Sequence, residues 1–126
     1  MRNRRGVNWT LENEPWSVGV ARRRVVAQLG EWGYGPGPEL QEAVEAVTGL
    51  LVTAAASDRG RRISVHLSDQ ERQVCVVALS HQAGAPTGHV LDGDRILHEI
   101  TEQTGVVGCG TDAGPHGRRV WAVIEL

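Results

Sequence analysis

The sequence of 126 residues predicts an α/β (α+β) two-layer sandwich, in which a mixed, mostly antiparallel sheet carries about three helices on one face. Two periodicities predict it, since some segments alternate apolar and polar residues as strands do, whereas others repeat apolar residues every three or four positions as helices do. The segments also follow the order strand, helix, helix, strand, strand, helix, strand, strand. The length fits one domain, residues 1–126, with a short flexible N-terminus at 1–5.

The first half of the chain predicts one strand and two helices. Residues 6–12 alternate as a half-buried strand does. Ser17 suits the N-cap of a helix that ends at Gly33, and Pro38 suits the first turn of a second helix that runs to about Ala56. The residues expected to face the core are Val18, Ala21, Val25, Leu29 and Trp32 in the first helix, and Leu40, Val44, Val47, Leu51 and Ala54 or Ala55 in the second.

The second half predicts a hairpin, a third helix and two closing strands. A strand at 63–67 and a turn at 68–71 lead to a return strand at 73–80, whose continuous run VCVVAL predicts a central strand covered on both faces. After an irregular loop at 81–90, a helix is expected at 91–104 with Asp92 as its cap. Strands at 106–110 and 118–126 follow, joined by a turn at 111–117.

Composition excludes several classes of function. The formal net charge of -2 gives no overall attraction to nucleic acid, and all 13 basic residues are arginine, so no catalytic lysine is available. We attribute the arginines to codon bias and do not interpret them individually as phosphate ligands. The basic start lacks the apolar stretch of a signal peptide, and no apolar run approaches the roughly 20 residues that span a bilayer, so we expect a cytoplasmic protein without a membrane partner.

Histidine and cysteine invite a zinc hypothesis, but their spacing argues against it. No C-x-x-C or H-x-x-x-H pattern occurs, so no metal is expected and the histidines are interpreted as surface or hydrogen-bonded residues. Cys75 and Cys109 lie in apolar runs and are expected to be buried, reduced thiols. The five histidines are His66, His81, His89, His98 and His116.

Five segments carry a resemblance to a known family. A helix that begins Ala-Arg-Arg and ends Trp-Gly matches 17–33, and a helix reading Glu-Leu-Val-x-Asn-Ala before His-Gly matches GLLVTAAASDRG at 49–60. A strand ending Ser-Asp before a loop rich in Gly or Pro matches LSHQAGAP at 79–86. A Gly-x-Gly-Leu helix matches 93–106, and an ending Gly-x-x-Val-Trp-Ala-x-Leu matches 117–126. Together they resemble the GHKL (Bergerat-fold) ATPase superfamily, closest to small bacterial anti-sigma factors and serine-protein kinases.

The resemblance implies a nucleotide site whose chemical groups are replaced here. Ala54 stands where the family has an Asn that binds Mg²⁺, and Leu50 where it has the Glu that acts as general base. His81 replaces the Asp that accepts the adenine amino group, and Arg95 replaces the second glycine of the phosphate loop. No catalytic residue is therefore expected. The vestigial pocket, expected to be small or closed, comprises Ala54, His81, Gly84, Gly93 and Arg95.

The resemblance and these replacements together imply a pseudo-ATPase that is not an enzyme and needs no cofactor. Its expected role is regulatory protein binding in transcription, with a sigma factor, an anti-anti-sigma-like protein or a small transcriptional regulator as partner. A homodimer is expected through Trp9 or Trp16, near an edge-forming first strand. The alternative is an ATP-binding serine/threonine-protein kinase that holds Mg-ATP in a rearranged pocket of His81, Gly93 and Arg95.

Overall fold

The computed structural model describes residues 5–81, 90–114 and 117–126. It contains a five-stranded antiparallel sheet and three helices, so the predicted α+β fold class is confirmed. Within the described ranges, no helix is both long enough and apolar enough to cross a membrane. The elements are β1 (Gly6–Glu12), α1 (Ser17–Glu31), α2 (Pro38–Ala56), β2 (Arg62–Asp69), β3 (Gln73–Ser80), α3 (Val90–Thr101), β4 (Val106–Gly114) and β5 (Gly117–Glu125).

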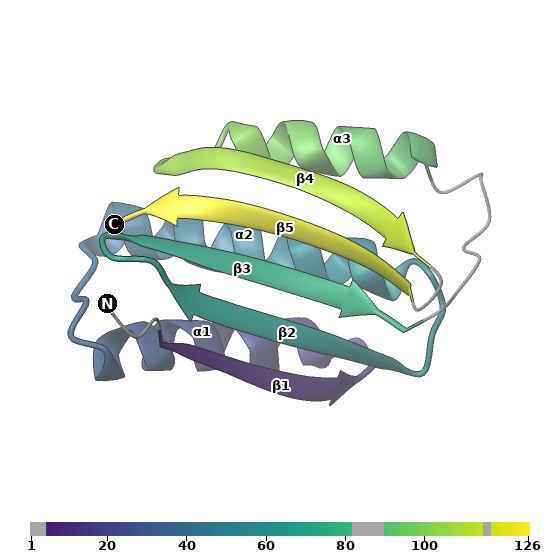
Figure 1. The fold of residues 1–126 in the computed structure, drawn as a ribbon, viewed down its shortest axis with the longest axis horizontal. Coiled ribbons are helices and arrows are strands. Elements are labelled where there is room, and N and C mark those ends of the chain that lie inside the picture. The colour runs from purple at the N-terminus through teal and green to yellow at the C-terminus, as the bar shows by residue number, and fades with distance from the viewer. Residues whose placement is uncertain (1–4, 82–89, 115–116) are drawn as a thin grey trace.

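The strands lie in the order β1-β2-β3-β5-β4, and every neighbouring pair is antiparallel. The central position of β3 agrees with its continuous apolar run, and β1 forms one edge as expected. After α3 the chain forms the opposite edge as β4, and β5 then returns between β4 and β3 (Figure 1). The two C-terminal strands therefore lie in the sheet in the reverse of their order along the chain: β5 is next to β3, and β4 forms the edge.

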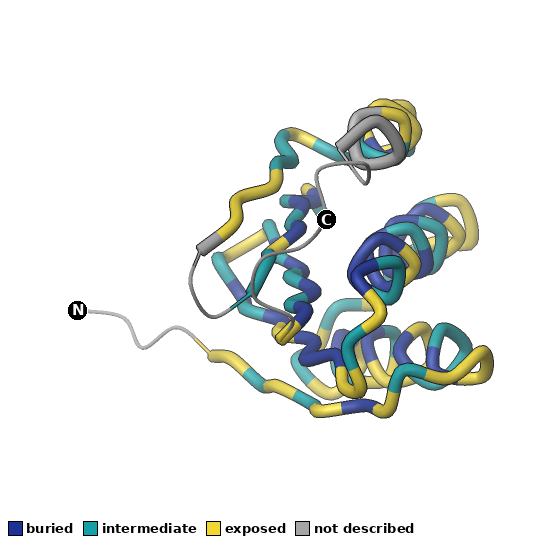
Figure 2. The backbone as a smooth tube through the Cα atoms, turned by 90° about the vertical axis from the view of Figure 1, so that its right-hand side faces the viewer, coloured by how far each residue is buried: buried dark blue, intermediate teal, exposed yellow. Residues whose placement is uncertain are grey.

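The helices form one layer and the sheet forms the other. Figure 2 shows α1, α2 and α3 on the same side of the sheet, and Figure 1 shows α3 beside β4. The interface between the layers is the core, to which α1 contributes Ala21, Val25 and Leu29, as predicted. The other buried apolar side chains come mainly from α2 and from alternate positions of the strands: Val44, Val47, Leu51, Ala54, Ala55, Ile63, Val65, Leu67, Val74, Val76, Ala78, Val120, Ala122 and Ile124.

The predicted coverage of β3 on both faces is wrong for the part of the chain that the structure describes. Val74, Val76 and Ala78 face the helices and are buried, whereas the alternate residues Cys75 and Val77 lie on the other face, which no described helix covers. An apolar run indicates that a strand favours burial on both faces, but it does not indicate which part of a protein covers each face. This uncovered face is important for the functional argument below.

Two predicted helix caps are also wrong. Ser17 is the first residue of α1, and its hydroxyl donates to the carbonyl of Glu12, so it ties the helix to the end of β1. Asp92 lies inside α3, because that helix begins two residues earlier at Val90. The same helix ends at Thr101 and not at 104, since the chain turns before Gly105, whose φ of +85° suits glycine.

The C-terminal hairpin is longer than predicted. Pairing between β4 and β5 continues to Gly114 opposite Gly117, so much of the expected turn at 111–117 is strand. The Thr111 hydroxyl donates to the Arg119 carbonyl at 2.9 Å, and the Asp112 carboxylate pairs with the Arg119 guanidinium at 2.8 Å. These cross-strand contacts extend the ladder over polar residues that the sequence pattern assigns to a turn.

Candidate functional site

Leu50, at the expected position of the lost general base, and Ala54, of the expected vestigial pocket, lie one turn apart on α2. Ala54 is 1% exposed and belongs to the core, and Leu50 is half-buried and packs against it. Neither side chain offers a metal ligand or a proton acceptor. At these two positions α2 therefore contributes packing and no chemically active side chain.

The other expected pocket residues are separated from this part of α2. His81 is exposed and follows the last residue of β3, and Arg95 is exposed on α3. Gly93 lies within α3, and Gly84 lies outside the described residues. Ser80, the residue before His81, donates a hydrogen bond to Asp58, which follows the end of α2, so His81 lies near that end. Arg95 makes no described contact there.

A buried polar cluster lies where the end of α2 meets the sheet. The Arg118 guanidinium, at the start of β5, donates from Nε to Asp58 Oδ2 at 2.9 Å and from Nη2 to the Ala54 carbonyl at 2.8 Å. The Ser80 hydroxyl donates to Asp58 Oδ2 at 2.7 Å, and the Ser57 hydroxyl donates to the Ala54 carbonyl at 2.6 Å. The space beside Ala54 is therefore occupied by side chains of the protein itself.

The ion pair in this cluster is deeply buried. The Asp58 side chain is 0% exposed and the Arg118 side chain 11% exposed. Burying two charges is costly unless hydrogen bonds compensate, and within the described residues Asp58 Oδ1 has no such partner. Sequence reasoning missed this cluster, because its members are up to 64 residues apart and follow no periodic spacing.

The backbone at Gly117 makes the cluster possible. Its φ is +137°, and a Cβ atom at this position would lie 1.8 Å from the Ser80 carbonyl oxygen. Only glycine allows β5 to begin so close to the end of β3. Its successor Arg118 then reaches Asp58.

His81 forms a second polar contact on the other side of the sheet. Its Nε2 lies 2.6 Å from the hydroxyl oxygen of Ser64, which is 7% exposed on β2. Both residues line an open hollow of about 910 Å³ at the end of β1 and β2, together with Thr10 and Asn13. Four exposed charged residues complete its wall: Glu12, Glu14, Arg61 and Arg62.

A smaller hollow lies at the opposite end of the sheet. It has a volume of about 480 Å³ and lies between the start of α2, at Pro38 and Leu40, and the Thr104 and Gly105 turn. Among the described residues, Leu50, Ala54 and Arg95 do not line either of these two hollows.

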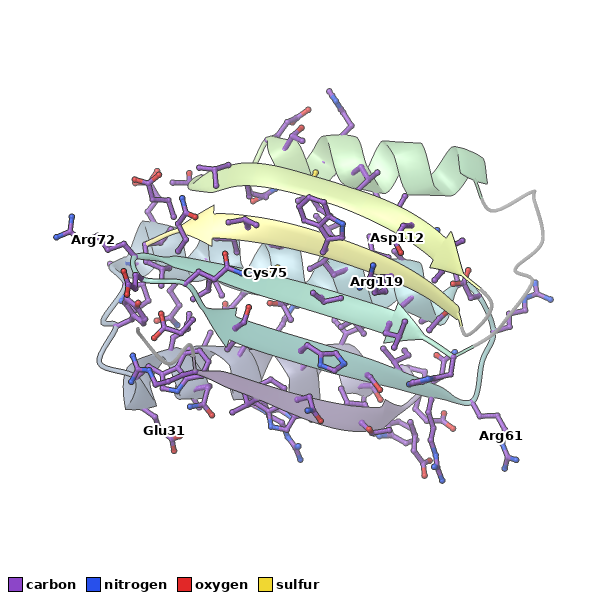
Figure 3. The ribbon with its side chains drawn as sticks, in the orientation of Figure 1. Glu31, Arg61, Arg72, Cys75, Asp112 and Arg119 are labelled. Carbon is purple, nitrogen blue, oxygen red and sulfur yellow. The ribbon has the colours of Figure 1, made fainter. Side chains whose placement is uncertain are left out.

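The uncovered face of the sheet carries an apolar patch, which we define as Cys75, Val77 and Leu79 of β3 with Trp121 and Val123 of β5. In the strand register Cys75 lies opposite Val123 and Val77 opposite Trp121, so the side chains are neighbours on one face. All five are half-buried. Figure 3 shows this face toward the viewer, with Cys75 labelled on β3.

The indole of Trp121 lies against Gly110 of β4. A Cβ atom at Gly110 would lie 2.7 Å from its Cζ2, so glycine at this position makes room for the ring. The polar residues Ser64, His66 and Ser68 border the patch on β2, and the Arg119 and Asp112 ion pair lies at its end (Figure 3). The sequence indicated the apolar run in β3 but not its union with Trp121 and Val123.

Cys75 and Cys109 are both free cysteines. Both are half-buried, not fully buried as expected, and burial raises the pKa of the Cys75 and Cys109 thiols. Cys109 lies on the helix side of β4, where its thiol donates to the Leu97 carbonyl at 3.7 Å. In the described ranges, no group of three or more His, Cys, Asp or Glu residues is arranged to hold a metal ion.

No protein-family model matches the chain, and no curated protein matches it. The resemblance to the GHKL superfamily therefore stays a prediction that rests on the five sequence segments and their order.

Proposed function

We propose that this chain is a regulatory protein-binding module, a pseudo-ATPase related to anti-sigma factors, that docks its partner on the uncovered face of the sheet. The apolar patch is the observation that carries the proposal. Contiguous apolar patches on the surface of soluble proteins often mark sites of protein recognition. The polar border on β2 and the ion pair at the end resemble the rim of a protein interface.

The patch has the composition of an interface centre. Trp121 supplies a large, rigid apolar surface, and Val77, Leu79 and Val123 extend it across two central strands. Aromatic residues surrounded by smaller apolar contacts dominate the binding energy of protein interfaces, and charged residues are depleted there. Asp112 and Arg119 pair with each other, so the face offers a partner little uncompensated charge.

The partner class comes from the sequence resemblance: a sigma factor, an anti-anti-sigma-like protein or a small transcriptional regulator. A second copy of the chain is a further candidate, because the same face on two copies would be self-complementary. The expected use of Trp9 in a dimer is disfavoured by its packing against the core. Trp16 is 66% exposed next to the end of β1 and remains available.

Site-specific photocrosslinking tests the proposal. A photoreactive amino acid at position 77 is compared with the same amino acid at Glu31, an exposed position on α1 that Figure 3 shows far from the patch. In the cells that naturally produce the chain, position 77 is expected to crosslink to one of the named partner classes or to a second copy. The substitution Val77→Glu is expected to abolish copurification of the same protein. Equal crosslinking at both positions, or none at position 77, contradicts the proposal.

The kinase alternative makes a different prediction. A rearranged pocket of His81, Gly93 and Arg95 would bind Mg-ATP, although Arg95 does not line the hollow that contains His81. Isothermal titration with Mg-ATP and Mg-ADP is expected to give no binding in the micromolar range. Micromolar binding would replace our proposal with the nucleotide-dependent alternative.

A further inference from the structure

The larger hollow is lined by acidic and basic side chains that form no ion pair with one another in the described part of the chain. Glu12 of β1 lies directly opposite Arg62 of β2 in the antiparallel register, and both side chains are exposed. Across the described part of the chain neither takes part in an ion pair, although residues opposite each other in a sheet are close enough for one. A carboxylate and a guanidinium are thus both available to a third molecule.

The hollow also offers neutral hydrogen-bonding groups beside these charges. Ser64 lies on the same face of β2 two residues from Arg62, and Thr10 lies opposite Ser64 on β1. The Ser64 hydroxyl oxygen lies 2.6 Å from Nε2 of the His81 imidazole. In the tautomer with the proton on Nε2, His81 donates to Ser64, and the hydroxyl proton of Ser64 is free to donate to a ligand. Hydroxyl groups next to a guanidinium are suited to the oxygens of a carboxylate.

We propose that this hollow binds a small zwitterion, an amino acid or short peptide with a free amino and a free carboxyl group. The ligand carboxylate contacts Arg62 and the hydroxyls of Ser64 and Thr10, and the ligand ammonium contacts Glu12. The volume of about 910 Å³ lies within the range of about 300 to 1,000 Å³ that small-molecule sites occupy. The site adjoins the apolar patch at Ser64, which borders both, but its charged groups Glu12 and Arg62 lie outside the patch, and the site does not depend on the proposed role of the patch.

The charge balance favours a zwitterion over a simple anion. Glu12 and Glu14 oppose Arg61 and Arg62, so the formal charge of the wall is zero. A simple anion would therefore meet the two carboxylates of this wall as well as its two guanidinium groups. A ligand with one positive and one negative group can place each group next to a wall residue of the opposite charge.

Titration with the dipeptide L-alanyl-L-alanine, followed by NMR of backbone amides, tests the site. Its N-acetyl derivative retains only the carboxylate, and its C-terminal amide retains only the ammonium. We expect the free dipeptide to shift the amide signals of residues 10–14 and 60–64, with an apparent dissociation constant about tenfold lower than either derivative gives. Arg62→Gln and Glu12→Gln are each expected to weaken dipeptide binding about tenfold.

Two controls separate this site from the rest of the molecule. Glu31→Gln removes an exposed carboxylate on α1, and Val77→Glu disrupts the apolar patch; both are expected to leave dipeptide binding unchanged. Retained amide spectra in the Arg62→Gln and Glu12→Gln variants verify folding. Equal binding of the free and blocked dipeptides, absence of shifts at 10–14 and 60–64, or binding insensitive to both site variants would overturn the proposal.

Discussion

Arg118 and Asp58 form an ion pair across the interface between the helical layer and the sheet, with Nε 2.9 Å from Oδ2. The same guanidinium donates to the carbonyl of Ala54, one of the residues expected from the sequence to line a vestigial pocket. The Arg118 side chain of β5 thus holds the C-terminal end of α2 against the sheet. Arg118 makes several of the polar contacts next to the expected pocket, and these contacts connect α2 to the sheet.

The ion pair gives a first prediction about stability. Arg118→Ala leaves the Asp58 carboxylate buried without its cation, so we expect the free energy of unfolding to fall by about 3 to 5 kcal/mol in urea titrations. The double variant Asp58→Asn with Arg118→Ala is expected to cost less than the sum of the single variants. Arg119→Ala is the control, since its ion pair with Asp112 is exposed and little change is expected. Additive single effects would contradict a coupled pair.

Gly117 gives a second prediction, because its backbone contact precedes Arg118. Gly117→Ala would place a Cβ atom 1.8 Å from the Ser80 carbonyl oxygen at a φ of +137°, so we expect destabilisation by more than about 2 kcal/mol. Gly30→Ala is a matched control, because a Cβ atom at Gly30 meets nothing within 4 Å. That variant is expected to gain roughly 0.5 to 1 kcal/mol, as helical alanine does over glycine. Equal melting temperatures for the two variants would refute the steric argument.

A third prediction concerns pH and the opposite end of the sheet. Burial of the Asp69 carboxyl acts to raise its pKa, but hydrogen bonds from the Tyr34 hydroxyl, the Arg5 guanidinium and the Glu71 amide outweigh it and hold the pKa below 3.8. A lowered folded-state pKa stabilises the protein above pH 3.8 and loses that contribution as pH falls through the folded-state value. The stability difference between the native chain and Asp69→Asn should therefore shrink as pH is lowered from 6 to 3.

The same cluster offers an internal check on this pH prediction. Tyr34→Phe removes the hydroxyl that lies 2.6 Å from Asp69 Oδ1, so it should reduce the acid-dependent loss of stability without abolishing it. Arg5 still donates to the carboxylate in that variant, at 2.9 Å from its Nε. An unchanged acid unfolding profile in both Asp69→Asn and Tyr34→Phe would count against the assignment to this carboxyl.

The elements were predictable because their side-chain periods are local. Alternation placed β1, β2 and β5, and the helical repeat placed Ala21, Val25 and Leu29 of α1 on the buried side. The extra length of β4 was not predictable, since Asp112 and the glycines of the stretch 111–117 favour a turn, whereas in the structure Thr111 and Asp112 both contact Arg119 across the strands. Pairing between strands is a tertiary property, and it overrode the local preference.

The candidate site was less predictable than the fold. Leu50 and Ala54 identified an end of α2 that lacks reactive side chains, but nothing in the sequence linked Asp58 with Arg118, which are 60 residues apart. The sequence indicated the part of the apolar patch that lies in β3. The register between β3 and β5 is needed to show that Trp121 and Val123 belong to the same surface. Contacts of this kind depend on strand order, which hydrophobic periodicity does not encode.

Thiol chemistry on the uncovered face gives the last prediction. Burial raises the pKa of the Cys75 thiol above 9.0, and the thiolate is the reactive form, so alkylation should be slow at pH 7 and rise about tenfold per pH unit toward the raised pKa. If a partner or a second copy covers the apolar patch, complex formation should slow the alkylation of Cys75, measured by mass spectrometry in the Cys109→Ser variant. Cys109, beneath α3, should be unaffected in the Cys75→Ser variant. Equal protection of both thiols would point to a general conformational change, because only Cys75 lies on the proposed docking face.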